Sequence, residues 1–243
     1  MEKKKSITRE YIIKSEDRKI HCRLFRRKCK GLYIAVTPDL TVNITAPLRA
    51  SDSFIHEAVD KKIPWILKTI QRLKKCHSLP LPEKYESGER LAYLGKEYIL
   101  RVHKGKRKTA RLLDDMLVVQ LPVPDMKGVK RAVEKWFRLQ AEETFEDYLE
   151  KGYRLISQYC VPEPVLKIRR MKSRWGSCSR SGQITLNLGL IHLPPVCIEY
   201  IIMHELCHLK HLNHSKHYYQ FLQHCMPDWK ERKTILESYR LSV

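Results

Sequence analysis

The residues best suited to chemistry lie between positions 203 and 215, where the sequence reads MHELCHLKHLNHS. His204, Glu205 and His208 form the pattern H-E-x-x-H. Residues four apart are neighbours on one face of a helix, so the two imidazoles can bind the same metal ion. Glu205 projects about 100° around the helix from His204, which leaves it beside a water on the metal. The pattern predicts a zinc hydrolase helix with Glu205 as the general base.

A zinc ion in a catalytic site needs three protein ligands and one open position. His211 is a poor third ligand on a straight helix, because it lies about 10 Å from His204 along the axis. Asn213 tolerates the left-handed conformation that ends helices, and we expect the chain to turn back there and bring His214 to the metal. We therefore predict one zinc ion per chain, bound by His204, His208 and His214.

A histidine-rich surface helix without a metal is the alternative interpretation of this stretch. Six of the eleven histidines fall between positions 201 and 224. His211, His217 and His224 are expected to be solvated or to lie behind the ligands. The apolar run 198–203 precedes the motif and favours a buried helix over a surface helix.

The elements that must position this motif begin with a long helix. Asp125 can cap a helix that runs to about Tyr159, with a bend allowed at Gly152. Strands are expected at 165–169 and 183–187, followed by the metal helix from about 195 and by two C-terminal helices. This is the order of a minimal zincin domain: a backing helix, a small sheet, the H-E-x-x-H helix and C-terminal helices. The strand at 183–187 is expected at the sheet edge, where it would hold an extended peptide by main-chain hydrogen bonds.

The first half of the chain is expected to be rich in β-structure. Short alternating runs between 11 and 44 predict strands, and further strands are expected at 90–94, 97–102 and 111–121. Ser51 or Asp52 can cap a helix to about Cys76, broken or kinked at Pro64. Prolines at 122 and 124 stop the last strand. The fold class predicted is α+β, with a basic β-rich N-terminal domain at 1–121 and a zincin-like metallohydrolase domain at 125–243.

The net charge of +20 favours anionic partners such as nucleic acid, nucleotides or an acidic protein. Residues 1–124 hold 28 Lys and Arg against 14 Asp and Glu, so the excess lies mostly in the first half. The basic clusters 26–30 and 104–108 are expected to be loops that recruit nucleic acid or another anion and do no chemistry. A well-solvated basic surface is the alternative. No run of eighteen apolar residues predicts a membrane span, and scattered cysteines without C-x-x-C favour the cytoplasm.

The segment 169–232 resembles the YgjP-like metallopeptidase family, which is related to the SprT-like zincins. The matching features are Ser173-Arg174-Trp175-Gly176-Ser177-Cys178, the strand ending at Asn187, Tyr200, His204 to Leu209, Asn213-His214-Ser215 and Pro227-Asp228-x-Lys230. The resemblance implies that His204, His208 and His214 bind zinc and that Glu205 is the catalytic base. The chain departs from the family at Tyr218-Tyr219, where Phe-Trp is usual, so the cleft wall can differ. Metzincins share the histidine spacing but not the other features.

Three residues are candidates for substrate contact: Arg174, Asn187 and Tyr218. Arg174 could bind a carboxylate or phosphate of the substrate, or stabilise a developing oxyanion. The alternative for this stretch is structural, with Trp175 filling the core and Gly176 making a turn.

The function predicted from these residues is a zinc-dependent hydrolase that acts as a peptidase on peptide or protein substrates. A nucleoside triphosphate pyrophosphatase in the same site is one alternative, because Arg169, Arg170, Lys172 and Arg174 supply positive charge nearby. A nucleic-acid-binding module with a structural metal is another. Glu205 argues against it, since a structural site has no use for that acid and is closed by a fourth ligand. Manganese or another metal stays open as the ion bound.

The assignment of the third ligand is directly testable. Replacing His214 by Ala should lower the zinc content of the purified protein sharply, because the site loses one of three ligands. The matched change His211→Ala should leave the content near one ion per chain. Elemental analysis that shows loss of zinc in the His211 variant, and not in the His214 variant, would reverse the assignment.

Overall fold

The structure is a computed structural model that describes residues 8–15, 18–37, 40–76 and 79–239. It is of the mixed α+β class expected from the sequence. The chain forms two compact units, Met1–Cys76 and His77–Val243. This division falls well before the boundary expected at 122–125. The reason is that the strands between 90 and 121 share a hydrophobic core with the long helix that follows them.

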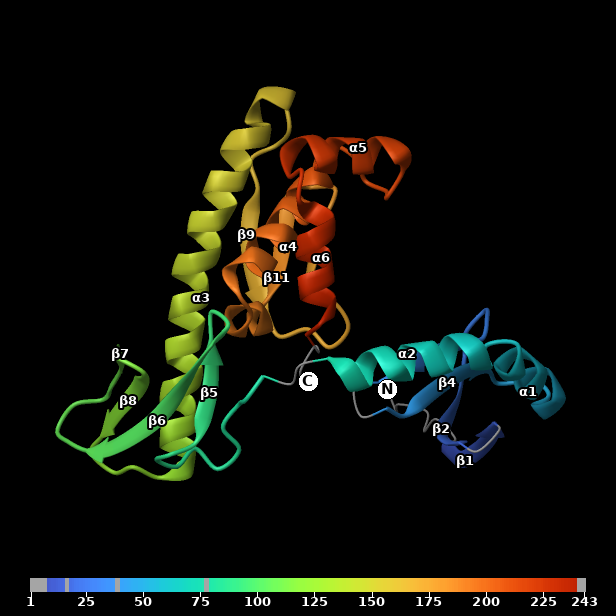
Figure 1. The fold of residues 1–243 in the computed structure, drawn as a ribbon, viewed down its shortest axis with the longest axis horizontal. Helices are drawn as coiled ribbons and strands as arrows, with labels where there is room; N and C mark the ends of the chain where they lie inside the picture. Colours follow the sequence, from blue (N-terminus) through green and yellow to red (C-terminus); the bar gives the residue numbers. More distant parts are fainter. Residues whose placement is uncertain (1–7, 16–17, 38–39, 77–78, 240–243) are drawn as a thin grey trace. The chain divides into compact units, whose positions relative to one another are not determined.

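The first unit is a four-stranded sheet with two helices on one face (Figure 1). Its strands pair in the order β1-β2-β4-β3, with bounds β1 Thr8–Ser15, β2 Arg18–Arg27, β3 Tyr33–Val36 and β4 Val42–Pro47. Its helices are α1 Asp52–Asp60 and α2 Ile63–Lys75. Alternate strand residues such as Cys22 and Ile44 are buried together with Ile55 and Val59 of α1. Among the described residues of this unit, no helix covers the other face of the sheet.

Two local features of the first unit follow directly from sequence. The Ser51 side chain accepts a hydrogen bond from the Phe54 backbone N–H and caps α1, and Pro64 lies in the first turn of α2. Arg26 and Arg27 belong to β2, so the expected loop begins only at residue 28. The Arg26 guanidinium donates to the Ala50 carbonyl and pairs with Asp52, which gives Arg26 a structural role in this unit.

The second unit begins with another four-stranded sheet. Its order is β5-β6-β8-β7, with bounds β5 Arg90–Tyr93, β6 Lys96–Lys104, β7 Thr109–Leu113 and β8 Met116–Leu121. The single strand expected at 111–121 is therefore wrong: β7 and β8 form an antiparallel hairpin. Asp114, with φ of 51°, makes the tight turn between them, since a short polar residue tolerates the left-handed region.

The long helix α3, Met126–Ile156, packs against both sheets of the second unit (Figure 1). Asp125 caps it as expected, accepting a hydrogen bond from the Gly128 N–H. The second sheet has the order β10-β11-β9, with bounds β9 Val165–Arg169, β10 Gly176–Cys178 and β11 Gln183–Asn187. The expectation that 183–187 is an edge strand is wrong, because β11 pairs on both sides. The edges of this sheet are β9 and β10.

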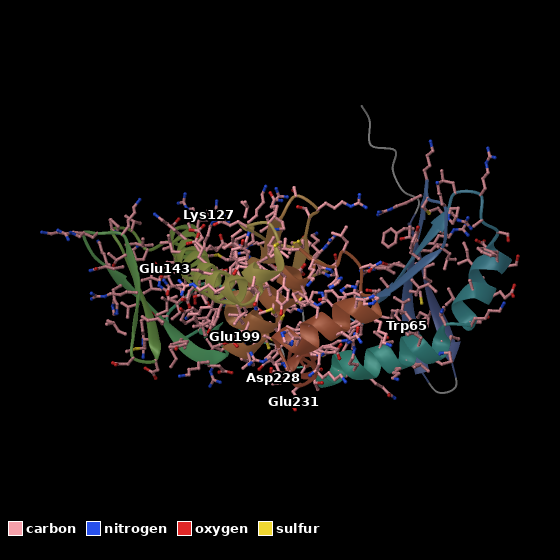
Figure 2. All side chains as sticks on the ribbon, turned by 90° about the horizontal axis from the view of Figure 1, so that it is seen from above. Trp65, Lys127, Glu143, Glu199, Asp228 and Glu231 are labelled. Atoms are coloured by element: carbon pink, nitrogen blue, oxygen red, sulfur yellow. The ribbon has the colours of Figure 1, made fainter. Side chains whose placement is uncertain are left out.

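The helix α4, Pro195–Cys207, carries the metal motif and lies between α3 and the C-terminal helices. These are α5 Lys216–Cys225 and α6 Trp229–Glu237. Arg232 of α6 pairs with both Glu199 of α4 and Asp228, and these two acidic residues are labelled in Figure 2. Among the described residues, no helix combines the length and the apolar character that crossing a bilayer requires.

Candidate metal centre

Three histidine rings converge at the end of α4. The Nε2 atom of His214 lies 3.1 Å from the Nε2 atom of His208 and 3.1 Å from that of His204. One possible ligand atom from each ring falls within 4.8 Å of the others. Two nitrogens on a tetrahedral zinc ion, each bound at about 2.0–2.1 Å, are separated by roughly 3.4 Å. The three rings therefore fit one zinc ion with little movement, and the structure brings together the residues that the sequence predicted.

The chain turns back earlier than expected to achieve this convergence. α4 ends at Cys207, and His208 already lies in the cap position. Short turns continue through Lys210, whose N–H donates to the Cys207 carbonyl. Asn213 does not adopt a left-handed conformation, so the expected mechanism of the turn is wrong. The expected outcome, His214 close to His204 and His208, is nevertheless found. Ser215 then caps α5 by accepting from the Tyr218 N–H, which starts the next helix directly after His214.

Tyr218 holds the His204 ring from behind. Its side chain is fully buried, and its hydroxyl donates to the His204 carbonyl oxygen at 3.0 Å. The hydroxyl has only one proton, so it accepts from Nδ1–H of His204 at 2.8 Å. This fixes the tautomer that leaves Nε2 unprotonated and ready to bind a metal. The expectation that Tyr218 contacts substrate is therefore corrected, because its polar atom is buried and already used.

His208 is oriented by a backbone group. Its Nδ1–H donates to the His211 carbonyl oxygen at 2.9 Å, which leaves Nε2 for the metal. His211 thus contributes through its main chain, while its ring lies over Phe221 and His217. This agrees with the expectation from the sequence that the His211 side chain lies behind the three converging histidines and is not one of the metal ligands.

Burial and the neighbouring rings favour the neutral form of two of the histidines. Burial is the main cause that lowers the pKa of His204 to about 3, and His208, His214 and Lys233 add to the effect. The pKa of His214 is also lowered, first by burial and then by His208 and Lys233. A metal binds the neutral form of imidazole, so both shifts favour ligation.

Glu205 lies against the backbone of β10, where the chain has a glycine. A Cβ atom built on Gly176 would stand 2.5 Å from Oε1 of Glu205 and 2.8 Å from its Cγ, far inside contact distance. Any other residue at 176 would therefore displace the carboxylate. The sequence offered Gly176 as a turn residue, but it opens β10 and its role is close approach. The family motif that includes Gly176 was the available signal for this role.

The environment of Glu205 suits a base. Glu205 as a residue is 4% exposed, and burial raises its pKa to about 7. The Arg174 charge and a hydrogen bond from the Cys178 backbone N–H act in the opposite direction. A carboxyl whose pKa lies near neutrality can both accept and return a proton, which is what general acid–base catalysis requires.

Asn187 and Arg174, the other predicted substrate residues, lie in different environments. The Asn187 amide donates to the carbonyls of Met171 and Arg174 at 2.8 and 3.0 Å, and its Oδ1 accepts from Met171 and Gly189. It is 4% exposed, so it clamps the loop before β10 and the expected substrate contact is corrected. Arg174 is exposed in that loop and its charge reaches Glu205. Trp175 packs partly buried against the core, as the structural alternative expected.

Three convergent imidazoles beside a buried carboxylate are the arrangement that metal-dependent hydrolases use. Comparison with known proteins narrows this class. The family model described as YgjP-like, metallopeptidase domain, matches residues 30–239, which is more than half of the chain. The chain therefore belongs to the YgjP-like metallopeptidase family. This confirms the resemblance seen in the sequence and makes the protein a metallopeptidase-like hydrolase.

Solved structures add two partial likenesses. The metallopeptidase zymogen of Pyrococcus abyssi abylysin matches 37% of this chain and 87% of its own, with 29% identity and a TM-score of 0.33. The metallopeptidase zymogen of Methanocaldococcus jannaschii jannalysin matches 37% of this chain and 84% of its own, with 23% identity and a TM-score of 0.32. Among curated proteins, no sequence matches this chain.

The role found for Tyr218 generates a prediction. Tyr218→Phe should weaken zinc binding by about 10–100-fold, the usual effect of removing a group that orients a metal ligand. Tyr219→Phe is the matched control, since that neighbouring ring is exposed and stacks on His214. Titration against a chromophoric chelator measures both affinities. Equal affinity in the Tyr218 variant and the unmodified protein would show that the hydroxyl does not orient His204.

Proposed function

We propose that this protein is a zinc-dependent peptidase in which Glu205 is the general base. His204, His208 and His214 would hold one zinc ion. When bound there, the ion would polarise a carbonyl and lower the pKa of a water. The observation that carries the proposal is the buried Glu205 carboxylate, held against Gly176 on the helix that supplies two of the three imidazoles. The family match is consistent with this reaction class.

Glu205 performs the proton transfers in the proposed mechanism. Its carboxylate accepts a proton from the attacking water and delivers it to the nitrogen that leaves the scissile bond. A pKa near 7 allows both transfers at neutral pH. The fixed position against β10 keeps the carboxylate in place between the two transfers, so no reorganisation precedes the second one.

Substrate would lie along β10 in this proposal. β10 is an edge of its sheet and contacts α4, whereas the strand first expected there, β11, is paired on both sides. An extended peptide can add to an unpaired edge by main-chain hydrogen bonds. Arg174, exposed just before β10, is the proposed contact for a substrate carboxylate or for the developing oxyanion. The order of long helix α3, small sheet and helix α4 supports the minimal zincin domain that we propose here.

Hydrolysis of a nucleoside triphosphate is the second candidate, supported by positive charge near the site. Arg169, Lys172 and Arg174 are exposed on β9 and the loop that follows it. Arg170 contributes less, since it pairs with Glu134 at 3.2 Å. A structural metal is the weakest candidate, because only three possible ligands converge among the described residues.

Glu205→Gln separates catalysis from metal binding. The variant should keep its zinc, because Glu205 lies outside the cluster of three histidines. It should lose about 10²–10⁴-fold in hydrolysis, since the amide cannot accept the proton. Purified zinc-loaded protein is assayed against a peptide library, casein and the nucleoside triphosphates. Turnover of triphosphates alone would sink the peptidase proposal, and full activity of the variant would remove Glu205 as the base.

Gly176→Ala tests the close approach to Glu205. The added methyl pushes the carboxylate away, and displacements of about 1 Å can cost on the order of 10²-fold in rate. Zinc content should stay unchanged. Gly189→Ala is the matched control, because a Cβ at that position meets its neighbours at an ordinary 3.5 Å. Equal rates for the two variants, measured on the same substrate, would refute the steric role of Gly176.

A further inference from the structure

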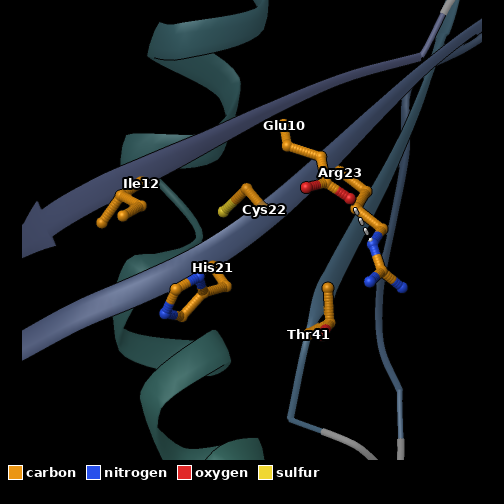
Figure 3. Close-up of a pocket in the computed structure, with 6 residues that line it drawn as sticks. All are labelled: Glu10, Ile12, His21, Cys22, Arg23 and Thr41. Atoms are coloured by element: carbon orange, nitrogen blue, oxygen red, sulfur yellow. Dashed lines mark hydrogen bonds and ion pairs between the residues drawn. The ribbon is translucent and has the colours of Figure 1, made fainter.

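The first unit has a sheet face that the metal site does not use. Residues 20, 22 and 24 of β2 and 42, 44 and 46 of β4 are buried against α1 and α2. Side chains alternate along a strand, so the odd-numbered residues of β2 and β4 point to the opposite face. Figure 3 shows His21 and Arg23 projecting from β2 on this face, with the helix behind the strands. We name it the open face.

Two aromatic side chains lie in one row of the open face. Register pairs Phe25 with Thr45, and Thr45 with Tyr33, so the two rings flank a small hydroxyl residue. Strands are about 4.8 Å apart, which places the two ring positions about 10 Å from each other. Tyr33 is 60% exposed, and the Arg27 guanidinium lies 5.2 Å from the centre of the half-buried Phe25 ring. This row therefore combines one exposed ring, one half-buried ring and a cation over the latter.

Positive charge surrounds the end of the sheet that carries these rings. Lys28 and Lys30 follow β2 in the connection to β3, and Arg49 follows β4. All three are exposed, and neither they nor Arg27 form an ion pair within the described part of the chain. The first unit as a whole holds 19 Lys and Arg against 8 Asp and Glu over residues 1–76, a net charge of +11. This field attracts a polyanion to the unit.

The far end of the open face is less suited to an anion. Glu10 of β1 pairs with Arg23 of β2 at 2.9 Å, which neutralises that guanidinium. Both residues line a hollow of about 320 Å³, together with Ile12 and His21 (Figure 3). The strongest combination of available cations and rings is therefore found at the row of Phe25, Thr45 and Tyr33.

We propose that the open face binds single-stranded nucleic acid, with bases stacked on Phe25 and Tyr33 and phosphates held by Arg27, Lys28, Lys30 and Arg49. The major groove of a duplex admits a helix or a two-stranded ribbon, and the face of a four-stranded sheet is wider than either. Unpaired bases, in contrast, can lie flat on aromatic rings. Aromatic platforms edged by cations are the general solution for binding single strands. This function requires neither the metal nor Glu205, and it differs from recruitment by the basic loops alone.

The test uses the full-length protein and a fluorescein-labelled strand of about 12 nucleotides, read by anisotropy at ~50 mM salt. Oligo-dT and oligo-rU distinguish DNA from RNA, and a duplex of equal length serves as comparison. Tyr33→Ser should raise the Kd for single strands about 5-fold or more, the contribution of one stacked base. Phe54→Ser is the matched control, since Phe54 is 53% exposed on α1 of the covered side.

The phosphate contacts are tested through salt dependence. Lys28→Gln combined with Lys30→Gln should make the plot of log affinity against log salt shallower, by about 0.7 for each phosphate that the protein no longer neutralises. Arg72→Gln combined with Lys74→Gln removes the same charge from α2 and should leave the slope nearer that of the unmodified protein. Hydrolysis of a short neutral peptide should not change in the Tyr33 variant, so this proposal and the peptidase proposal can fail separately.

Three results would overturn the proposal. One is the absence of binding to either single strand at low salt. Another is equal binding to duplex and single strands with no effect of Tyr33→Ser, which would indicate phosphate contacts alone. In the third, poly-glutamate at equal charge concentration displaces the oligonucleotide, and Tyr33→Ser leaves the affinity for the oligonucleotide unchanged. That result would identify an acidic protein as the partner. A measured loss of affinity with Tyr33→Ser, and none with Phe54→Ser, establishes the stacking surface.

Discussion

Two nitrogen–nitrogen separations of 3.1 Å are the constraint on which the rest of the metal centre depends. Tyr218 and the His211 carbonyl assign the Nδ1 protons of His204 and His208, so their Nε2 lone pairs face the third ring. Nitrogen atoms held this close suit either a shared hydrogen bond or a common cation that accepts their lone pairs. The early end of α4, the cap at Ser215 and the burial of Tyr218 all serve to hold this arrangement. The three imidazoles are thus placed so that they could hold one metal ion, and the chemistry proposed for the site follows from the carboxylate beside it.

Two glycines decide how closely other elements approach α4. Gly152 of α3 faces Leu206, where an added Cβ would stand 2.7 Å from the leucine Cδ1, so the two helices can pack closely. Gly176 of β10 makes the corresponding approach to Glu205. The metal helix is therefore held on one side by helix packing and on another by a strand, and Arg232 ties it to α6 as well. A base that must keep its position through two proton transfers benefits from such support on several sides.

The convergence of His204, His208 and His214 could be predicted from the sequence, because their spacing is a property of the helix and of one short turn. The role of Tyr218 could not be predicted in the same way. Spacing shows which face of a helix a residue occupies, but it does not show that the Tyr218 hydroxyl would contact the His204 ring. Asn187 was misread for a related reason: an amide at a strand end can clamp a loop or contact a ligand, and both look alike in sequence. The hairpin at 109–121 was missed because Asp114-Asp115 is a weaker turn signal than Asn-Gly. The family motif includes Gly176, but only the structure shows that the absence of a Cβ atom there makes room for the Glu205 carboxylate.

Net charge alone is a weak guide to where an anion would bind, and the first unit shows why. Three arginines of β2 contribute equally to the net charge but differ in their contacts. Arg26 pairs with Asp52, Arg23 pairs with Glu10, and Arg27 lies over the Phe25 ring. What distinguishes the open face is the coincidence of cations that form no ion pair within the described residues with two aromatic positions in one register row. Leaving an aromatic ring in water forgoes the stabilisation that burial would give. Helices already bury the opposite face of this sheet, so Tyr33 is not needed for the core, and its ring is available to the partner proposed for the open face.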